Sequence, residues 1–159
     1  MKLLASTLAL LAVSAAANAA EPVVAASPEA QRAMLASSDP KLAANKKLVW
    51  DMWRTFLQGG DIDAADKYLA PEYHQHNPNA ETGLEGVKAY FRAAGRKAEP
   101  PKDYIDRLIA ITAEGDLVTL ALVREMKDKD GNAYTTTWFD MFRVANGKIV
   151  EHWDTATKP

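Results

Sequence analysis

The chain has 159 residues, no cysteine and a formal net charge of −2 at pH 7. This length corresponds to one domain with enough residues to bury a hydrophobic core. The absence of cysteine excludes disulfide bonds, thiolate metal sites and a thiol nucleophile, and without a basic stripe nucleic acid is not an expected partner.

The first residues are typical of a secretory signal peptide. Lys2 precedes an almost wholly apolar stretch, residues 3–17, and residues 17–19 (Ala-Asn-Ala) have the small-x-small pattern that a signal peptidase cuts. The apolar stretch is short and alanine-rich for a membrane span. We therefore expect residues 1–19 to be removed on secretion across the inner membrane. The mature protein is then expected to be soluble and periplasmic, with no membrane contact after cleavage.

Residues 20–38 are alanine-rich and weakly patterned, which favours a loosely ordered N-terminal arm. Within it, Ser27 followed by Pro28 could cap a short helix. The main domain is expected to cover residues 39–159.

Three helices are predicted at the start of this domain. The first begins at Asp39-Pro40 and carries apolar residues at helical spacing until Gly59-Gly60. The second is capped by Asp61 and ends before Pro71. After an extended piece, residues 72–77, the pattern Thr82-x-x-Glu85 resembles a capping box that opens the third helix.

From residue 104 onward the apolar period changes from about 3.6 to 2. Strands are predicted at residues 104–112, 117–126, 133–144 and 148–155, separated by turn-rich sequences. Asn146-Gly147 is the strongest hairpin signal. Helices followed by an antiparallel meander indicate an α+β fold with helices on one face of a curved sheet.

The last hairpin makes one carboxylate conspicuous. If Asn146 and Gly147 form a two-residue turn with a regular ladder, Phe142 faces Glu151 and Asp140 faces Trp153. The covered face then holds Asp140, Phe142, Val144, Ile149 and Trp153, and the other face holds Met141, Arg143, Val150 and His152.

Asp140 interrupts this apolar stripe, and burying a carboxylate is costly unless it is paired or lines a wet cavity. It is either a structural partner of an arginine such as Arg107 or Arg124, or a pocket carboxylate suited to proton transfer.

Two blocks, "EYHQHNPNAETGLEGVKAYF" and "WFDMFRVANGKIVEHWDT", resemble the SnoaL-like branch of the nuclear-transport-factor-2-like superfamily. The resemblance implies a cone-shaped, barrel-like fold. In it, three N-terminal helices pack on the concave face of a strongly curved mixed, mainly antiparallel sheet and enclose an apolar pocket. Relatives include polyketide cyclases and ketosteroid isomerases, which need no metal or organic cofactor.

Carried over by residue, the resemblance implies a catalytic pair of Asp140 and His76 that meet across the pocket. It also implies ligand-binding roles for Tyr73, Asn77, Phe142 and Trp153. The expected activity is cofactor-free acid–base catalysis, either aldol-type condensation or cyclisation or an isomerisation, on a small apolar or aromatic carbonyl compound.

Three alternatives stay open. The same pocket could serve a non-catalytic periplasmic binding protein. His74 and His76 share a strand face and could hold a metal with Asp140 as third ligand if His74 turned inward, whereas His152 is predicted on the opposite face from Asp140; no metal is expected. A homodimer formed through the outer sheet face is compatible with every one of these functions.

Overall fold

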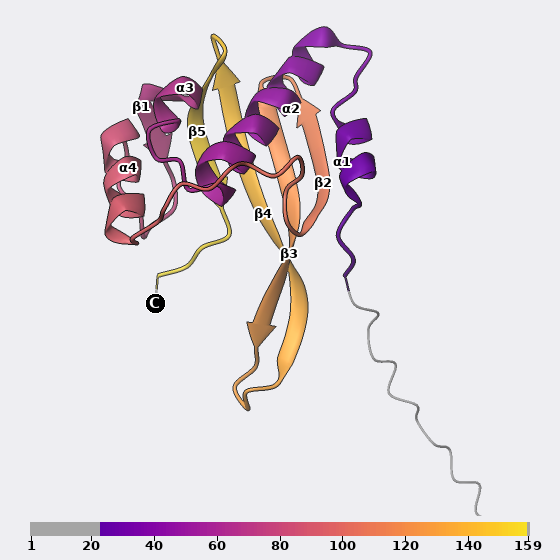
Figure 1. The fold of residues 1–159 in the computed structure, drawn as a ribbon, viewed down its shortest axis with the longest axis vertical. Coiled ribbons are helices and arrows are strands. Elements are labelled where there is room, and N and C mark those ends of the chain that lie inside the picture. The colour runs from indigo at the N-terminus through magenta and orange to yellow at the C-terminus, as the bar shows by residue number, and fades with distance from the viewer. Residues whose placement is uncertain (1–22, 159) are drawn as a thin grey trace, which may run out of the picture.

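The computed structural model describes residues 23–158 and places helices against one side of a five-stranded sheet (Figure 1). The predicted signal peptide lies outside these residues. None of the helices in the described part has the length and apolarity needed to cross a membrane. The elements in chain order are α1 (Pro28–Met34), α2 (Pro40–Met52), the π-helical η1 (Trp53–Gln58), α3 (Ala65–Tyr68), β1 (Leu69–Gln75), α4 (Leu84–Ala93), β2 (Leu108–Glu114), β3 (Leu117–Lys127), β4 (Ala133–Ala145) and β5 (Lys148–Asp154).

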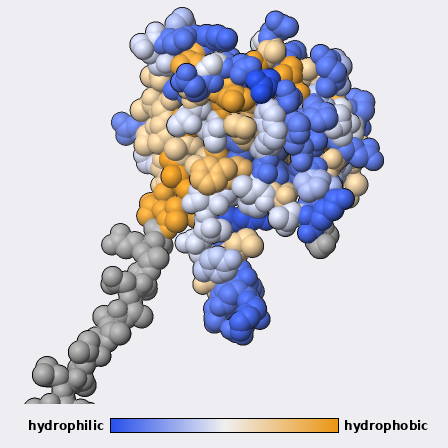
Figure 2. Space-filling view, turned by 180° about the vertical axis from the view of Figure 1, so that it is seen from behind, coloured by the Kyte–Doolittle hydropathy of each residue, from blue (hydrophilic) through white to orange (hydrophobic). Residues whose placement is uncertain are grey.

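The strand order in the sheet is β1-β5-β4-β3-β2, with β1 parallel to β5 and every other pair antiparallel. The α+β prediction is confirmed, with a mixed sheet that is curled but does not close into a barrel (Figure 1). The long β3–β4 hairpin projects from the body of the molecule, and Figure 2 shows its tip as a hydrophilic lobe.

The first long helix follows its sequence signals. Asp39 caps α2 by accepting a hydrogen bond from the Lys41 amide at 2.8 Å, and Pro40 occupies the first turn, where its missing N–H costs nothing. The helical run extends to Gly59 as predicted, but its last six residues, η1, take the π form, which recurs at functional sites.

The next two predicted helices need correction. The second helix, expected to reach Pro71, is the single turn α3, and β1 begins at Leu69 because Pro71 is tolerated on an edge strand. The predicted capping box does not form: Thr82 Oγ1 accepts a hydrogen bond from the Gln75 amide at 3.2 Å and contacts the Gln75 carbonyl oxygen at 3.3 Å. Helix α4 begins after Gly83, which makes no side-chain cap.

The expected N-terminal arm is anchored in its described part, residues 23–38. Gln31 of α1 is buried. Its Nε2 donates a hydrogen bond to the Ile105 carbonyl oxygen at 2.9 Å, and its Oε1 accepts one from the Ile105 amide at 2.8 Å. The strand predicted from residue 104 begins only at Leu108, because Arg107 takes a left-handed conformation (φ 64°).

The core fills the space between α2, η1 and the sheet. Its most deeply buried side chains include Val49, Met52, Phe56, Ile105, Leu108, Val118, Leu120, Phe142 and Ile149. This apolar burial, at roughly 25 cal/mol per Å², is the main source of stability and fixes the walls of the site described below.

The β4–β5 hairpin begins with the predicted two-residue turn and then departs from the predicted register. Val144 pairs with Ile149 as expected, but the next pairs are Arg143 with Glu151 and Phe142 with His152. Val150 is therefore an extra residue, a β-bulge, and a one-residue shift exchanges the two faces of the strand. His152 consequently shares the covered face with Phe142, and Trp153 lies on the outer face. The predicted positions of these two residues were wrong.

Candidate active site

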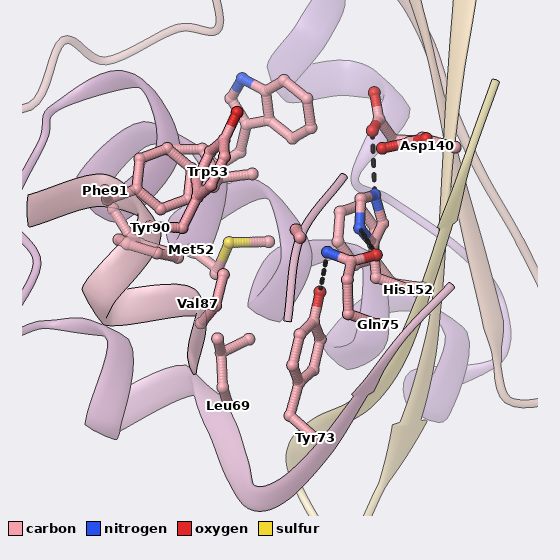
Figure 3. Close-up of a pocket in the computed structure, with 15 residues that line it drawn as sticks. Met52, Trp53, Leu69, Tyr73, Gln75, Val87, Tyr90, Phe91, Asp140 and His152 are labelled. Atoms are coloured by element: carbon pink, nitrogen blue, oxygen red, sulfur yellow. Dashed lines mark hydrogen bonds and ion pairs between the residues drawn. The ribbon is translucent and has the colours of Figure 1, made fainter. Parts of the chain in front are cut away.

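A cavity of about 250 Å³ lies between η1, α4 and the concave face of the sheet. Figure 3 shows how its wall divides by chemistry. One side is apolar and is formed by residues that include Met52, Trp53, Leu69, Val87 and Phe91. The polar side is formed by Tyr73 and Gln75 of β1, Asp140 of β4, and His152 and Asp154 of β5.

Asp140 is 5% exposed and His152 is 7% exposed, and they form a close pair. The distance from His152 Nε2 to Asp140 Oδ1 is 2.9 Å. Phe142 stacks on the imidazole with ring centroids 4.5 Å apart and so holds its plane. The second carboxylate oxygen, Asp140 Oδ2, is buried and has no hydrogen-bond partner among residues 23–158. A buried carboxylate oxygen without a donor is costly, so this atom favours a ligand that supplies a hydrogen.

Gln75 determines where the protons of His152 sit. Gln75 Oε1 accepts a hydrogen bond from the Asn77 amide at 2.9 Å, so this atom is the carbonyl oxygen of the side chain. The same oxygen lies 3.1 Å from His152 Nδ1, which must therefore carry a hydrogen. One further proton is shared between His152 Nε2 and Asp140 Oδ1, so the pair is either an imidazolium with a carboxylate or a neutral imidazole with a carboxylic acid.

Tyr73 supplies a hydroxyl group to the polar wall of the cavity. Gln75 Nε2 donates to the Tyr73 oxygen at 3.2 Å, and within the described residues the phenolic hydrogen has no acceptor. Burial raises the pKa of Tyr73 far above its ordinary value of 10.0, and the nearby carboxylates of Asp154 and Asp140 raise it further. Tyr73 therefore keeps its proton and is available to donate it in a hydrogen bond to a ligand oxygen.

Asn77 acts on the cavity through Asp154. Its Nδ2 donates to Asp154 Oδ2 at 2.6 Å, and the Ala156 amide donates to Asp154 Oδ1 at 2.8 Å. Within residues 23–158, the only group of three potential metal ligands is Asp140, His152 and Asp154, with ligand atoms within 4.8 Å of one another. His152 already bonds Asp140 and Gln75 through its two ring nitrogens, and Asp154 already accepts from Asn77 and Ala156, so an ion held by these two residues would compete with existing hydrogen bonds.

The structure does not bring His76 to Asp140. His76 Nε2 lies 3.1 Å from Glu151 Oε2 on the outer face, and the imidazole stacks on Trp153 with centroids 4.6 Å apart. His74 packs edge-on against His76 at 4.4 Å. The hydrogen bond from His76, with the charge of Arg143, holds the pKa of Glu151 below its usual value. The predicted meeting of His76 with Asp140, and the predicted place of Trp153 in the cavity, are both contradicted.

Tyr73, Phe142 and Asp140 do line the cavity as predicted, whereas His152 and Gln75 were missed. A signal for Gln75 was present in the sequence. Because successive side chains of a strand alternate, Tyr73 facing the cavity implies that Gln75 faces it too and that His76 does not. No comparable signal marks His152, because its position depends on the bulge.

The fold agrees with comparisons to known proteins. A family model described as a SnoaL-like domain matches residues 50–152, and the chain belongs to this family. A comparison with curated proteins finds no match.

Several solved structures share the fold. A proposed polyketide cyclase from Acidithiobacillus ferrooxidans is 21% identical with a TM-score of 0.53, covering 75% of this chain and 89% of its own. A SnoaL-like protein from Jannaschia sp., also proposed to be a polyketide cyclase, is 14% identical with a TM-score of 0.53, covering 76% and 91%. An LEH-like epoxide hydrolase from M. tuberculosis is 19% identical with a TM-score of 0.51, covering 72% and 84%. The family, the fold and the cavity together support a small-molecule binding or catalytic role.

Proposed function

We propose that the cavity binds a small, mainly apolar carbonyl compound and that Asp140 moves a proton at the carbon beside the carbonyl group. The observation that carries this proposal is the buried Asp140–His152 pair, with one carboxylate oxygen unpartnered, at the polar end of an apolar cavity. A base enclosed in this way is protected from water, and the pair supplies both a proton acceptor and a compensating charge.

The proposed reaction starts from the carboxylate–imidazolium form of the pair. Asp140 Oδ2 takes a proton from the α-carbon, the electron pair of the broken C–H bond forms the carbon–carbon double bond of the enolate, and the π pair of the carbonyl group moves to its oxygen. The resulting enolate accepts a hydrogen bond from the Tyr73 hydroxyl, while the imidazolium of His152 balances its charge. Gln75 keeps the hydrogen on His152 Nδ1 throughout, so that Nε2 stays directed at Asp140.

The enolate can react in two ways, and each returns Asp140 to its carboxylate form. If the ligand carries a β,γ carbon–carbon double bond, the enolate is a dienolate, and Asp140 can return the proton to its γ-carbon, which gives an isomerisation. Alternatively, the enolate carbon attacks a second carbonyl of the same molecule, and the proton goes to the new alkoxide, which gives an aldol-type ring closure. The volume of about 250 Å³ is below the roughly 300–1,000 Å³ of common ligand sites, which favours a compact ligand.

The test measures hydrogen–deuterium exchange at the α-carbons of 2-tetralone in D₂O by NMR. The wild-type protein should accelerate exchange, and Asp140→Asn and His152→Gln should each lower the rate by about 10²- to 10⁴-fold, the usual contribution of a general base. His76→Gln is the matched control: it removes an imidazole from the outer face and should leave the rate unchanged.

Stability separates a catalytic role of Asp140 from a structural one. In Asp140→Asn the new amide can donate to the free Nε2 of a neutral His152, so the melting temperature should be unchanged or higher. A large fall in melting temperature, or equal loss of exchange in the His76 control, would sink the proposal. Saturable binding of 2-tetralone without any exchange would instead identify a binding protein.

We also propose that the protein is exported and acts in the periplasm, which the apolar stretch at residues 3–17 supports. Expression of the full chain should give a periplasmic product whose N-terminus is Ala20. A cytoplasmic product that still starts at residue 1 would overturn this proposal.

A further inference from the structure

A second polar feature lies beside the cavity, where β3 and β4 leave the body of the molecule. Arg124 of β3 pairs with Thr136 of β4, and its guanidinium lies over the ring of Trp138, with Cζ 3.6 Å from the ring centroid. Trp138 and Asp140 are two residues apart on β4 and therefore point to the same face, roughly 7 Å apart along the strand. The stacked guanidinium thus lies on the Asp140 side of the sheet.

Arg124 has no anionic partner in the described part of the chain. No ion pair and no hydrogen bond is made by its guanidinium there, although its side chain is half-buried. The neighbouring carboxylate, Glu125, points to the other face and pairs with Arg107 at 3.1 Å. Since a guanidinium has five N–H donors in a rigid fork, a half-buried one without acceptors favours a planar oxyanion ligand.

Two depressions meet at Arg124. One, of about 260 Å³, is also lined by Trp53, Leu122, Trp138 and Asp140, and so connects the guanidinium to the catalytic carboxylate. The other, of about 410 Å³, is rich in hydroxyl and amide groups from Asn79, Thr136, Thr137, Thr155 and Thr157. Trp53 and Asp140 line both the first depression and the apolar cavity, so the two spaces lie next to each other.

From this arrangement we propose that the ligand carries a carboxylate and that Arg124, held by Trp138, binds it while the carbonyl end lies in the cavity. The substrate class is therefore a keto acid, in which a ketone and a carboxylate are joined by an apolar spacer. A monoanion fits better than a phosphate dianion, because Arg124 is the only cation among the residues that line the two depressions, and Asp140 and Asp154 are near. This inference rests on the proposed function, since it assigns a specificity group to the same site.

The test compares two probes of nearly the same shape, 4-acetylbenzoate and its neutral analogue 4-acetylbenzamide, by calorimetric or NMR titration. Wild-type protein should bind the carboxylate more tightly than the amide. Arg124→Gln should weaken binding of the carboxylate by roughly 10- to 100-fold, the usual value of a charge-assisted hydrogen-bonding pair, and leave the amide unaffected. Raising the salt concentration should weaken carboxylate binding to the wild type alone.

Two controls sharpen the result. Arg32→Gln removes the same charge from an exposed arginine of α1 that pairs with Asp103, and it should change neither affinity. Arg124→Lys keeps the charge without the planar fork and should recover only part of the carboxylate affinity.

The inference fails if the wild type does not prefer the carboxylate, or if Arg124→Gln weakens both probes equally. It also fails if the control Arg32→Gln weakens carboxylate binding as much as Arg124→Gln does, because the effect would then be one of overall charge. The proposed function has a separate test: exchange of 2-tetralone that depends on Asp140 and His152 supports it whatever the two benzoyl probes show.

Discussion

At the residue scale, the site depends on one side chain, Gln75, that carries no charge. Its oxygen, assigned by the Asn77 amide, specifies the tautomer of His152, and its amide group orients the hydroxyl of Tyr73. A single glutamine thus links the proposed base to the proposed oxyanion donor.

The raised pKa of Tyr73 predicts how the free energy of unfolding changes at high pH. Because its pKa in the folded state is raised above the ordinary 10.0, the unfolded chain loses this proton first as pH rises. The contribution of Tyr73 is complete below pH 10 and declines above it, by up to about 1.4 kcal/mol per pH unit. The free energy of unfolding between pH 8 and 11.5 should therefore fall more steeply in the wild type than in Tyr73→Phe. Tyr134→Phe, a change at an exposed tyrosine, should keep the wild-type slope, and equal slopes in all three proteins would contradict the assignment.

Residue chemistry was partly predictable from the sequence. Asp140 interrupts an apolar stripe, and this anomaly correctly placed a carboxylate in a pocket. The histidine was harder, because three histidines compete and each position depends on strand phase. Tyr73 and His76 were both expected in the cavity, although a regular strand cannot direct residues three apart to the same face.

At the scale of elements, the turn between η1 and α3 is a point of close backbone contact. Gly60 has φ 73°, and a Cβ on it would collide with the carbonyl oxygen of Lys97. The loop that contains Lys97 is also tied here by a hydrogen bond from the Glu99 amide to the Gly59 carbonyl at 2.8 Å. The apolar cavity wall formed by η1 is therefore held by a segment far along the chain.

This contact predicts that Gly60→Ala is strongly destabilising. The left-handed conformation alone costs an L-residue about 1–2 kcal/mol, and the collision with Lys97 adds to it. Gly95→Ala is the matched control, because Gly95 has φ 66° and open space around its Cβ position. Chemical denaturation should show a larger loss for Gly60→Ala, and similar losses in the two variants would mean that the Lys97 loop moves freely.

The position of an element could be predicted from the sequence where a local signal determines it. It could not be predicted where pairing with a distant strand determines it. Asp39-Pro40 and Asn146-Gly147 act within a few residues, and both predictions hold. The bulge at Val150 has no local signature, since it reflects pairing of β5 with strands on both sides. Thr82 likewise bonds Gln75 of the edge strand instead of capping its own helix.

At the scale of the whole molecule, the outer sheet face carries exposed apolar side chains. Phe139 is 49% exposed and, with Met141, Trp153 and Thr119, lines a shallow apolar depression. We propose that two copies of the chain pair through this face. Trp153 lies on it, where the sequence had predicted His152.

The homodimer proposal predicts that Phe139→Glu gives a monomer, because a charge would be buried against the partner. Light scattering on the purified protein measures the mass directly. Tyr134→Glu, a similar change at an exposed aromatic residue on the projecting hairpin, should stay dimeric. Wild-type protein that is already monomeric at high concentration would rule this interface out.

The parallel pairing of β1 with β5 has a consequence for folding. It joins residues 69–75 to residues 148–154, the first and last strands of the sheet in chain order, which are farther apart along the chain than any other two of its strands. Contacts of such long sequence separation close large loops, and their entropic cost delays them relative to local hairpins such as β4–β5. Gln75 and Tyr73 arrive on β1, whereas His152 arrives on β5. A nascent chain therefore has no assembled proton-transfer network until β5 has been synthesised and has paired with β1, so the site cannot form before the sheet is complete.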